Sequence, residues 1–127
     1  QIADVTALIA ETGSCVRLAS EDEIDRLTAV SGSGPGYVFE LMRSYVEAAK
    51  SVGFDQLTAR TLVFDTISGA VETARQSDAT LEELRDSVNS KNGTTQAGLA
   101  ELMRDGQLHQ LFENTVQAAY RRAAELK

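Results

Sequence analysis

Ser and Thr hydroxyls flank a glycine in residues 90–95, the segment Ser-Lys-Asn-Gly-Thr-Thr that leads into a predicted helix. The first backbone N–H groups of a helix have no intrahelical partner, and glycine lets a ligand come close to them. Together with hydroxyl donors, such amides bind small carboxylates even in a protein that is negative overall. The residues alone leave an equal alternative, in which Ser90 or Thr94 is only the helix N-cap.

A second glycine-rich segment could also bring backbone amides to a ligand. Three of the nine glycines and the only proline lie within residues 32–36, Gly-Ser-Gly-Pro-Gly, immediately before an apolar-rich run. The amides of the following helix can bind a carboxamide or an anionic group. Considered alone, these residues favour the alternative of a tight turn between helices, in which glycines adopt positive φ angles.

The single His and the single Cys give no basis for a Ser/His/Asp, Cys/His or multi-His arrangement, or for a metal site. We expect Cys15 to be a buried structural residue and His109 to lie at the surface. The acidic residues at 21–23 and 82–83 fall in predicted first helical turns, where they complement the helix dipole. That role is favoured over general acid/base work.

Helices must position both glycine-containing segments. Pro35 and Gly53 bracket one long helix, because proline is favoured near a helix start and glycine just past its end. Apolar residues recur at spacings of three and four, and they predict helices over residues 2–12, 21–31, 37–52, 56–76, 81–88, 96–106 and 108–127, with a short strand over 15–18. The class is therefore all-α from residue 20 onward.

Capping residues support these helix starts. Ser20 with Glu23, and Thr80 with Glu83, each match the Ser/Thr-x-x-Glu pattern of a capping box. Asp55 precedes the helix over residues 56–76 and is a good N-cap residue. These side chains fix where three of the predicted helices begin.

Size and charge limit the classes of protein. The 127 residues are 43% apolar and 24% charged, which fits one domain with a single core. The net charge is −7 and the basic residues are scattered, which argues against a nucleic-acid partner. No apolar run approaches the roughly 20 residues of a membrane span. The chain starts without a Met, inside an apolar-periodic stretch, so we expect a fragment of a longer protein.

Two apolar surfaces predict self-association. Residues 62–71 are apolar on more than one side of their predicted helix, and the helix over residues 37–52 carries a wide apolar face. One domain of this size could not cover both surfaces. We therefore expect a homodimer with intertwined helices.

Two motifs about 55 residues apart resemble one known family. Residues 27–39, LTAVSGSGPGYVF, are similar to the T-A-L-S-G-S-G-P-A-Y run that begins the C-terminal domain of pyrroline-5-carboxylate reductase. Residues 84–99, LRDSVNSKNGTTQAGL, resemble the signature L-x-x-x-V-T-S-P-G-G-T-T-x-x-G-L of the same family. The resemblance covers essentially the whole chain. It departs at residue 36, where Gly replaces Ala, and at residue 89, where Asn replaces Thr.

The resemblance implies a fold and a domain organisation. Residues 20–127 would be an all-α, multi-helix dimerisation domain, like the C-terminal domain of 6-phosphogluconate dehydrogenase. Residues 1–19 would be the last helix and strand of an N-terminal Rossmann domain that binds NADPH or NADH. The G-x-G-x-x-G fingerprint is absent from these 127 residues, so we expect that they do not hold the cofactor alone. The implied assembly is a homodimer, assembled further into a decamer in many relatives, in the cytoplasm.

The resemblance also implies a reaction, in which hydride passes from NAD(P)H to the C=N carbon of 1-pyrroline-5-carboxylate and gives L-proline. Ser90, Gly93 and Thr94 would hold the substrate carboxylate through hydroxyl and backbone N–H groups. Val88 would pack on the ring. The Thr95 hydroxyl would contact the ring nitrogen, which makes Thr95 the expected catalytic residue.

The same resemblance places Ser33 and Gly34 beside the nicotinamide. Lys91 and Asn92 stand where the family usually carries Pro-Gly. Losing the proline loosens the loop, and the lysine adds a positive charge beside the carboxylate site. These departures leave two alternatives open: a reductase of another cyclic imine, and a non-catalytic helical module that only oligomerises.

Overall fold

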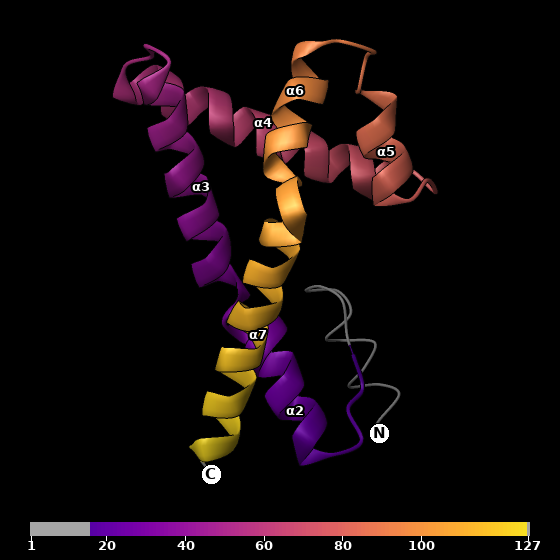
Figure 1. Ribbon diagram of the computed structural model, residues 1–127. Coiled ribbons are helices and arrows are strands. Elements are labelled where there is room, and N and C mark those ends of the chain that lie inside the picture. Colours follow the sequence, from indigo (N-terminus) through magenta and orange to yellow (C-terminus); the bar gives the residue numbers. More distant parts are fainter. Residues whose placement is uncertain (1–15, 127) are drawn as a thin grey trace.

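The computed structural model describes residues 16–126, and all of their regular structure is helical (Figure 1). This confirms the predicted all-α class. The predicted helix over residues 2–12 and the expected burial of Cys15 lie outside the described residues. The elements in chain order are α2 (Glu21–Leu27), the π-helix η1 (Thr28–Gly32), α3 (Gly34–Ser51), α4 (Gln56–Gln76), α5 (Leu81–Ser87), α6 (Thr94–Leu102), the 3₁₀-helix η2 (Arg104–Gly106) and α7 (Gln107–Glu125).

The predicted strand over residues 15–18 is wrong for residues 16–18, the part of it that is described. These residues have no regular secondary structure, and Val16 is 64% exposed. A strand is held by hydrogen bonds to a neighbouring strand. Residues 16–126 contain no strand that could supply them.

The helix starts follow the capping residues. Thr80 and Glu83 form a complete capping box, in which the Thr80 hydroxyl accepts from the Glu83 N–H at 3.2 Å and the Glu83 carboxylate accepts from the Thr80 N–H at 2.7 Å. In α2 the Ser20 hydroxyl accepts from the Glu23 N–H at 3.3 Å. The Glu23 carboxylate, however, accepts from the N–H of Ala19 at 2.6 Å, one residue before the predicted partner.

The glycine-rich segment at residues 32–36 is not a turn. The helix that begins with α2 widens into η1, where the Ser33 N–H donates to the Thr28 carbonyl at 2.8 Å, and α3 follows directly. None of Gly32, Gly34 and Gly36 has a positive φ. The alternative of a tight turn built on positive φ angles is therefore wrong. The π-type turn lets the chain change direction between α2 and α3 without any residue of positive φ.

A short turn joins α3 to α4. Gly53 has φ +108° and donates its N–H to the Lys50 carbonyl at 3.0 Å, which ends α3 in a conformation that favours glycine. The Asp55 carboxylate then accepts from the N–H groups of Leu57 and Thr58 at 2.9 and 3.0 Å. The predicted N-cap of α4 is confirmed.

The core lies between α3 and α4 and is small. Val46, Ala59 and Val63 form a buried cluster, with Ala49 and Ile67 packed against it. Ala29 in η1 is the other buried apolar residue of the described chain. No large side chain in the described part is fully buried. These contacts hold α3 against α4, but they do not make a full domain core.

The accessible surface shows how open the chain is. It measures 10153 Å², whereas a compact monomer of 13.7 kDa exposes about 6,600 Å². Large apolar side chains account for part of the excess, because Phe39, Leu57 and Leu111 are 69%, 74% and 62% exposed. The expectation of a single core within one chain is therefore wrong. A chain that forms a homodimer is expected to expose such an excess of apolar surface as a single subunit.

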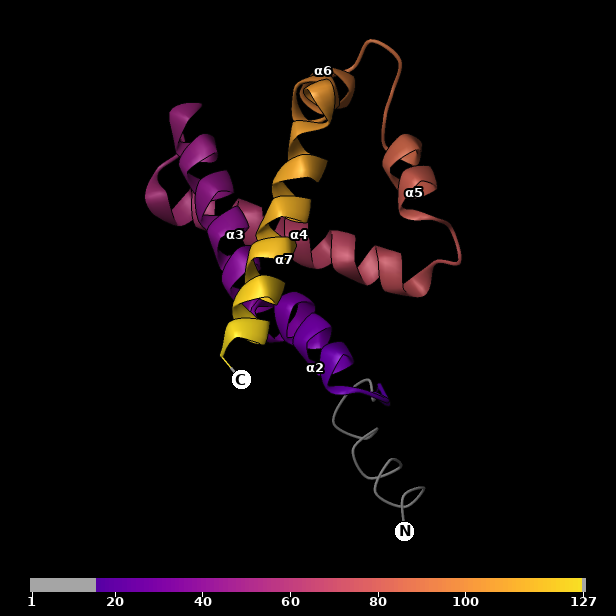
Figure 2. The ribbon, with the colours of Figure 1, turned by 60° about the horizontal axis from the view of Figure 1, so that its bottom comes forward.

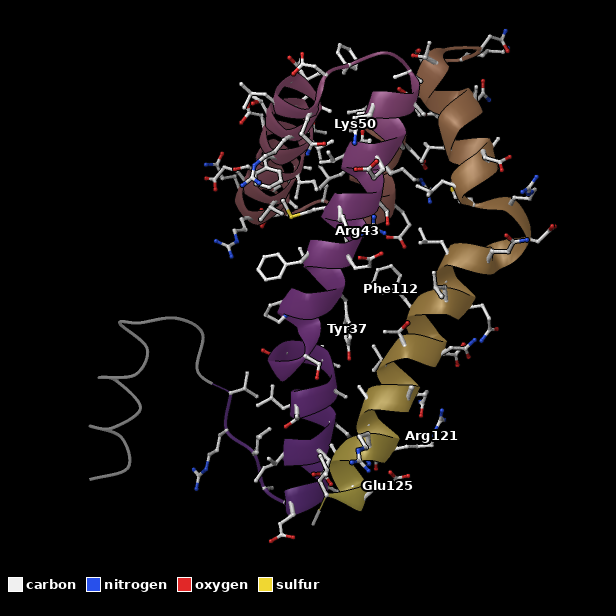
Figure 3. The ribbon with its side chains drawn as sticks, turned by 90° about the vertical axis from the view of Figure 1, so that its left-hand side faces the viewer. Tyr37, Arg43, Lys50, Phe112, Arg121 and Glu125 are labelled. Carbon is white, nitrogen blue, oxygen red and sulfur yellow. The ribbon has the colours of Figure 1, made fainter. Side chains whose placement is uncertain are left out.

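A second packing unit joins the two ends of the described chain. Helix α7 lies along η1 and α2 (Figures 1 and 3). The Tyr120 hydroxyl donates to the Asp22 carboxylate, which also forms an ion pair with Arg26 at 2.5 Å. His109 on α7 is exposed, as predicted. Helices α5 and α6 stand apart from α2 in both views (Figures 1 and 2).

Candidate functional site

The connection between α5 and α6 holds the first candidate site. It runs over residues 88–93 at one end of the molecule (Figures 1 and 2). The Gly93 N–H donates to the Ser90 carbonyl at 2.9 Å and closes a four-residue turn. Val88, which follows α5 directly, is 67% exposed and free to pack against a ligand.

Gly93 lies close to Ser90, which favours a residue without a side chain. A Cβ at residue 93 would lie 2.1 Å from the Ser90 Oγ and 3.1 Å from the Ser90 carbonyl oxygen. A side chain at residue 93 would force the Ser90 hydroxyl to rotate away and the Ser90 carbonyl to move by a few tenths of an ångström. The glycine thus keeps the Ser90 hydroxyl directly beside the start of α6.

Asn92 explains one departure from the family pattern. Its φ is +59°, in the left-handed region that glycine adopts most easily. Asn is among the few other residues that tolerate this region. Asn92 therefore preserves the backbone shape that the family's usual glycine allows, whereas Lys91 does not reproduce the rigidity of the usual proline.

The N-terminus of α6 is open, unlike those of α2 and α5. Its N-cap is Gly93, which has no side chain to accept from the first turn. Thr94 and Thr95 are the first two helical residues, so the alternative in which Ser90 or Thr94 is the N-cap is wrong. The first-turn amides are left without a side-chain acceptor, at the positive end of the helix dipole.

Three residues with hydroxyl groups lie at or just before this helix start. The side chains of Ser90, Thr94 and Thr95 form no hydrogen bond with any part of residues 16–126. Ser90 and Thr94 are exposed, and Thr95 is half-buried. Lys91 is exposed beside them and adds a positive charge. Unengaged amide and hydroxyl donors at a helix start can bind a small carboxylate.

The sequence analysis missed Gln96. Its side-chain Oε1 accepts from the N–H of Asn92 at 2.6 Å and connects the turn to α6. The sequence contained a signal for this contact, because Gln at the third helical position is the residue whose side chain accepts from an earlier backbone N–H in a capping box. It was overlooked because the N-cap is a glycine.

A shallow groove of about 290 Å³ lies beside the loop, between α5 and α6. The Arg85 guanidinium spans it, with Nη1 3.9 Å from the Met103 sulfur, and pairs with Asp86 at 2.8 Å. Arg85 thereby lowers the pKa of the Asp86 carboxyl. The side-chain oxygen of Asn89, the residue that replaces the family's Thr, is buried here and has no hydrogen-bond partner in the described part of the chain.

The second candidate site is separate from the first. Ser33 and Gly34 are half-buried at the junction of η1 and α3, away from the loop between α5 and α6 (Figures 1 and 2). A Cβ at Gly34 or Gly36 would meet no atom within 4 Å. The packing of this chain therefore does not explain these two glycines. The two predicted sets of site residues do not come together within one chain.

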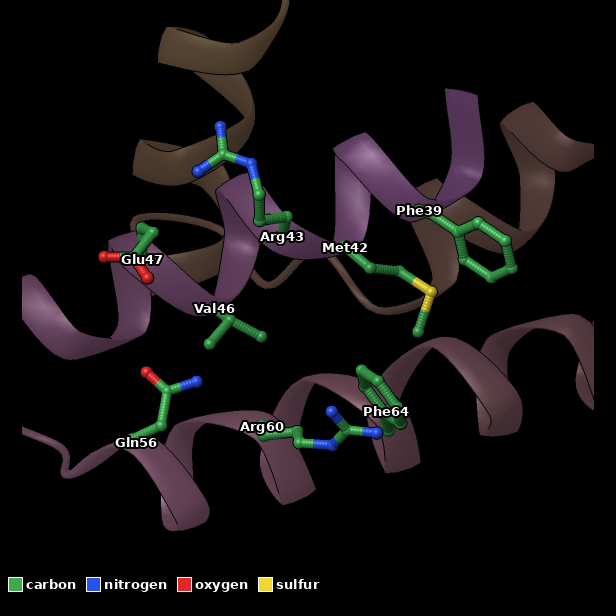
Figure 4. A pocket seen from close by; sticks show the side chains of 8 residues that line it. All are labelled: Phe39, Met42, Arg43, Val46, Glu47, Gln56, Arg60 and Phe64. Atoms are coloured by element: carbon green, nitrogen blue, oxygen red, sulfur yellow. The ribbon is translucent and has the colours of Figure 1, made fainter. Parts of the chain in front are cut away.

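A third region, between α3 and α4, shows no catalytic arrangement among the described residues. A hollow between α3 and α4, about 390 Å³, is lined mainly by apolar groups and the stems of charged side chains (Figure 4). Its Arg60 guanidinium lies 4.5 Å from the centre of the Phe64 ring, a cation–π contact. Among residues 16–126 no three His, Cys, Asp or Glu side chains gather as metal ligands. None of the described helices is long and apolar enough to cross a bilayer.

Comparison with known proteins decides the family. A family model described as pyrroline-5-carboxylate reductase dimerisation matches residues 21–126. The chain belongs to this pyrroline-5-carboxylate reductase family. The Pseudomonas aeruginosa pyrroline-5-carboxylate reductase is 40% identical over 119 residues, which are 94% of this chain and 43% of that protein. Pyrroline-5-carboxylate reductase 2 of Bacillus subtilis is 36% identical over 92% of this chain and 42% of its own length.

Solved structures of pyrroline-5-carboxylate reductases have the same fold. The Coxiella burnetii protein matches with a TM-score of 0.91 and 33% identity, over 99% of this chain and 46% of that one. The Plasmodium falciparum protein, which has NADP bound, matches with a TM-score of 0.83 and 30% identity, over 96% and 46%. The helical dimerisation domain of the family is thus confirmed as the fold. The chain spans less than half the length of the relatives it matches.

Proposed function

We propose that residues 20–127 are the dimerisation and substrate-binding part of an NAD(P)H-dependent pyrroline-5-carboxylate reductase. Residues 1–19 would end the nucleotide-binding domain with which they act. The observation that carries the proposal is the open start of α6, where the N-cap supplies no side-chain acceptor and the hydroxyls of Ser90, Thr94 and Thr95 have no hydrogen bond within residues 16–126. In a chain of this family, that arrangement suits the carboxylate of 1-pyrroline-5-carboxylate.

Each loop residue has a role in this proposal. Ser90 and Thr94 donate their hydroxyls to the substrate carboxylate, and Gly93 lets that carboxylate reach the first-turn amides. Val88 packs on the ring, because it is apolar and exposed at the edge of the loop. Thr95 is half-buried at the second helical position, and its hydroxyl contacts the ring nitrogen. The reduced ring then leaves as L-proline.

The cofactor supplies the hydride that reduces the ring C=N bond, and this chain contributes one wall for it. A Cβ at Gly34 or Gly36 would meet no atom within 4 Å, so the backbone there is open to the approach of a nicotinamide. The Ser33 hydroxyl forms no hydrogen bond within the described residues and can donate to a carboxamide. The chain's own task is orientation: it holds the substrate carboxylate at one point and the ring nitrogen at another.

The proposal includes a homodimer. An excess of exposed apolar surface over what a compact monomer shows is typical of a subunit whose core is completed by a partner. Because Ser33 and Ser90 lie in separate parts of one chain, one complete site would need residues from outside it. Further assembly into a decamer and a cytoplasmic location belong to the same proposal.

The test is an assay of the protein that carries these residues together with its nucleotide-binding domain. We expect oxidation of NADPH or NADH that depends on 1-pyrroline-5-carboxylate and yields L-proline. The 127-residue chain alone should show no turnover, since it lacks a dinucleotide fingerprint. Turnover by the chain alone would contradict the domain assignment.

The same assay with a six-membered cyclic imine carboxylate addresses the second candidate, a reductase of another cyclic imine. The observation behind it is Lys91, which adds a charge beside the loop where the family usually has a proline. A higher kcat/KM for the larger ring would favour this candidate. A folded, dimeric protein without any imine reduction would instead support the non-catalytic oligomerisation module.

A further inference from the structure

We infer that Gln96 is a positioning residue for the loop at residues 90–95, and that it supplies the rigidity which Lys91 does not. The inference rests on the proposed function, because the ligand of the loop is the substrate carboxylate. Gln96 does not touch that ligand in this account. It acts by holding the backbone of Asn92.

The geometry of the loop gives Gln96 this role. The turn has three hydrogen bonds within the described residues. The Gly93 N–H donates to the Ser90 carbonyl at 2.9 Å, the Asn92 N–H donates to Gln96 Oε1 at 2.6 Å, and the Gly93 carbonyl accepts from the backbone N–H of Ala97 at 3.3 Å. The first bond closes the turn upon itself. Only the second connects the turn to a side chain of α6, the helix whose amides bind the ligand.

The backbone around Lys91 needs such a restraint. Asn92 has φ +59°, a conformation that costs free energy in a residue with a side chain. Lys91 has no hydrogen bond within residues 16–126 that would hold it, and its φ is not fixed by a ring as that of a proline would be. Without the bond from Asn92 to Gln96, the turn could relax and move the Ser90 hydroxyl away from the α6 amides.

The other helix starts show what is special about α6. Glu83 in α5 and Glu23 in α2 also reach back from the third helical position, to the N–H groups of Thr80 and Ala19. In both of those helices the N-cap hydroxyl also occupies a first-turn amide. In α6 the side chain at the third helical position also accepts from an earlier backbone N–H, but the N-cap has no side chain that could accept from a first-turn amide. Gln96 can therefore anchor the loop without closing the amides to a ligand.

The experiment compares Gln96→Ala in two backgrounds, the unaltered Lys91 and the substitution Lys91→Pro, in the protein that carries the nucleotide-binding domain. Proline is compatible with residue 91, whose φ is not positive and whose N–H makes no bond in the described chain. In the Lys91 background we expect KM for 1-pyrroline-5-carboxylate to rise about tenfold, with KM for NADPH unchanged. In the Lys91→Pro background, Gln96→Ala should alter this KM by less than about twofold.

A second readout does not depend on activity. Hydrogen exchange of the Asn92 amide should speed up in Gln96→Ala of the 127-residue chain, because its acceptor is gone. Gln76→Ala is the matched control: Gln76 also forms a side-chain hydrogen bond, to Glu72 at 2.5 Å within α4, and is exposed. It should leave both the Asn92 exchange rate and the substrate KM unchanged.

The outcomes separate the two proposals. Unchanged Asn92 exchange in Gln96→Ala, or an equal effect on KM in both backgrounds, would overturn the role of Gln96. If the starting protein reduces no cyclic imine, the proposed function is wrong. In that case the exchange experiment still decides whether Gln96 holds the loop.

Discussion

An added Cβ on Gly93 would lie 2.1 Å from the Oγ of Ser90, so only glycine at this position leaves the Ser90 hydroxyl where it is. Gly93→Ala should therefore displace the Ser90 hydroxyl and the start of α6. We expect kcat/KM for 1-pyrroline-5-carboxylate to fall at least tenfold, as a misplaced binding group commonly costs. Steady-state kinetics measures this directly.

Gly98→Ala is the matched control for that substitution. Gly98 lies on the same helix, and a Cβ there would meet no atom within 4 Å. Because alanine is a better helix former than glycine by about 1 kcal/mol, this variant should melt at a higher temperature with unaltered kinetics. Equal kinetic losses in both variants would mean that α6, and not the contact with Ser90, is responsible.

Thr95→Ala tests the proposed contact with the ring nitrogen. A hydrogen bond that strengthens as hydride is transferred contributes to kcat more than to binding. We expect kcat/KM to fall by roughly 10- to 1000-fold, the span of one catalytic hydrogen bond worth about 1.4 to 4 kcal/mol. The melting temperature should hardly change, because the Thr95 hydroxyl has no partner within residues 16–126. Normal kinetics with a lowered melting temperature would refute the catalytic role.

The homodimer can be tested by charge at an exposed apolar position. Phe39 is 69% exposed and lines the hollow between α3 and α4 (Figure 4). Phe39→Asp should convert the dimer to monomer at micromolar concentration, because an unpaired carboxylate is costly inside an apolar interface. Light scattering measures the mass. If the unaltered protein is a stable monomer, the predicted dimer is wrong.

The N-cap of α4 predicts a pH effect. The Thr58 hydroxyl, and then the backbone N–H groups of Thr58 and Leu57, hold the pKa of the Asp55 carboxyl below its ordinary value. This stabilisation is complete above the ordinary pKa of about 4 and is lost as the pH falls through the lowered pKa of the folded state. Asp55→Asn keeps a capping side chain that does not titrate. Its melting temperature should thus fall less than that of the unaltered protein between about pH 5 and pH 2, and parallel curves would contradict this.

Local signals predicted most of the fold. Ser20, Asp55 and Thr80 each marked a helix start that the structure has, because a capping side chain acts within three residues of itself. The predicted strand was wrong for residues 16–18, because a strand depends on a partner strand that the local sequence does not specify. The π-helix at residues 28–32 also escaped prediction, since glycine and proline suggested a turn more strongly than a widened helix.

The candidate site was predictable in composition and less so in arrangement. Residues 90–95 identified the open helix start, but the positive φ of Asn92 and the bond to Gln96 depend on how the turn folds onto α6. The distance between Ser33 and Ser90 was not predictable, because both motifs are local and their separation follows from how long helices pack. The residue types identify the hydrogen-bond donors, but the packing of the helices decides which donors lie close together.

The small core between α3 and α4 implies that stability is not a property of one chain. With Val46, Ala59 and Val63 as its buried cluster, most of the apolar burial must come from association. Folding and association would then be one equilibrium governed by mass action. Each tenfold dilution would remove about 1.4 kcal/mol from the stability of a dimer, and the melting temperature would drift downward with concentration. The amount of protein in the cell would then set how much of it is folded.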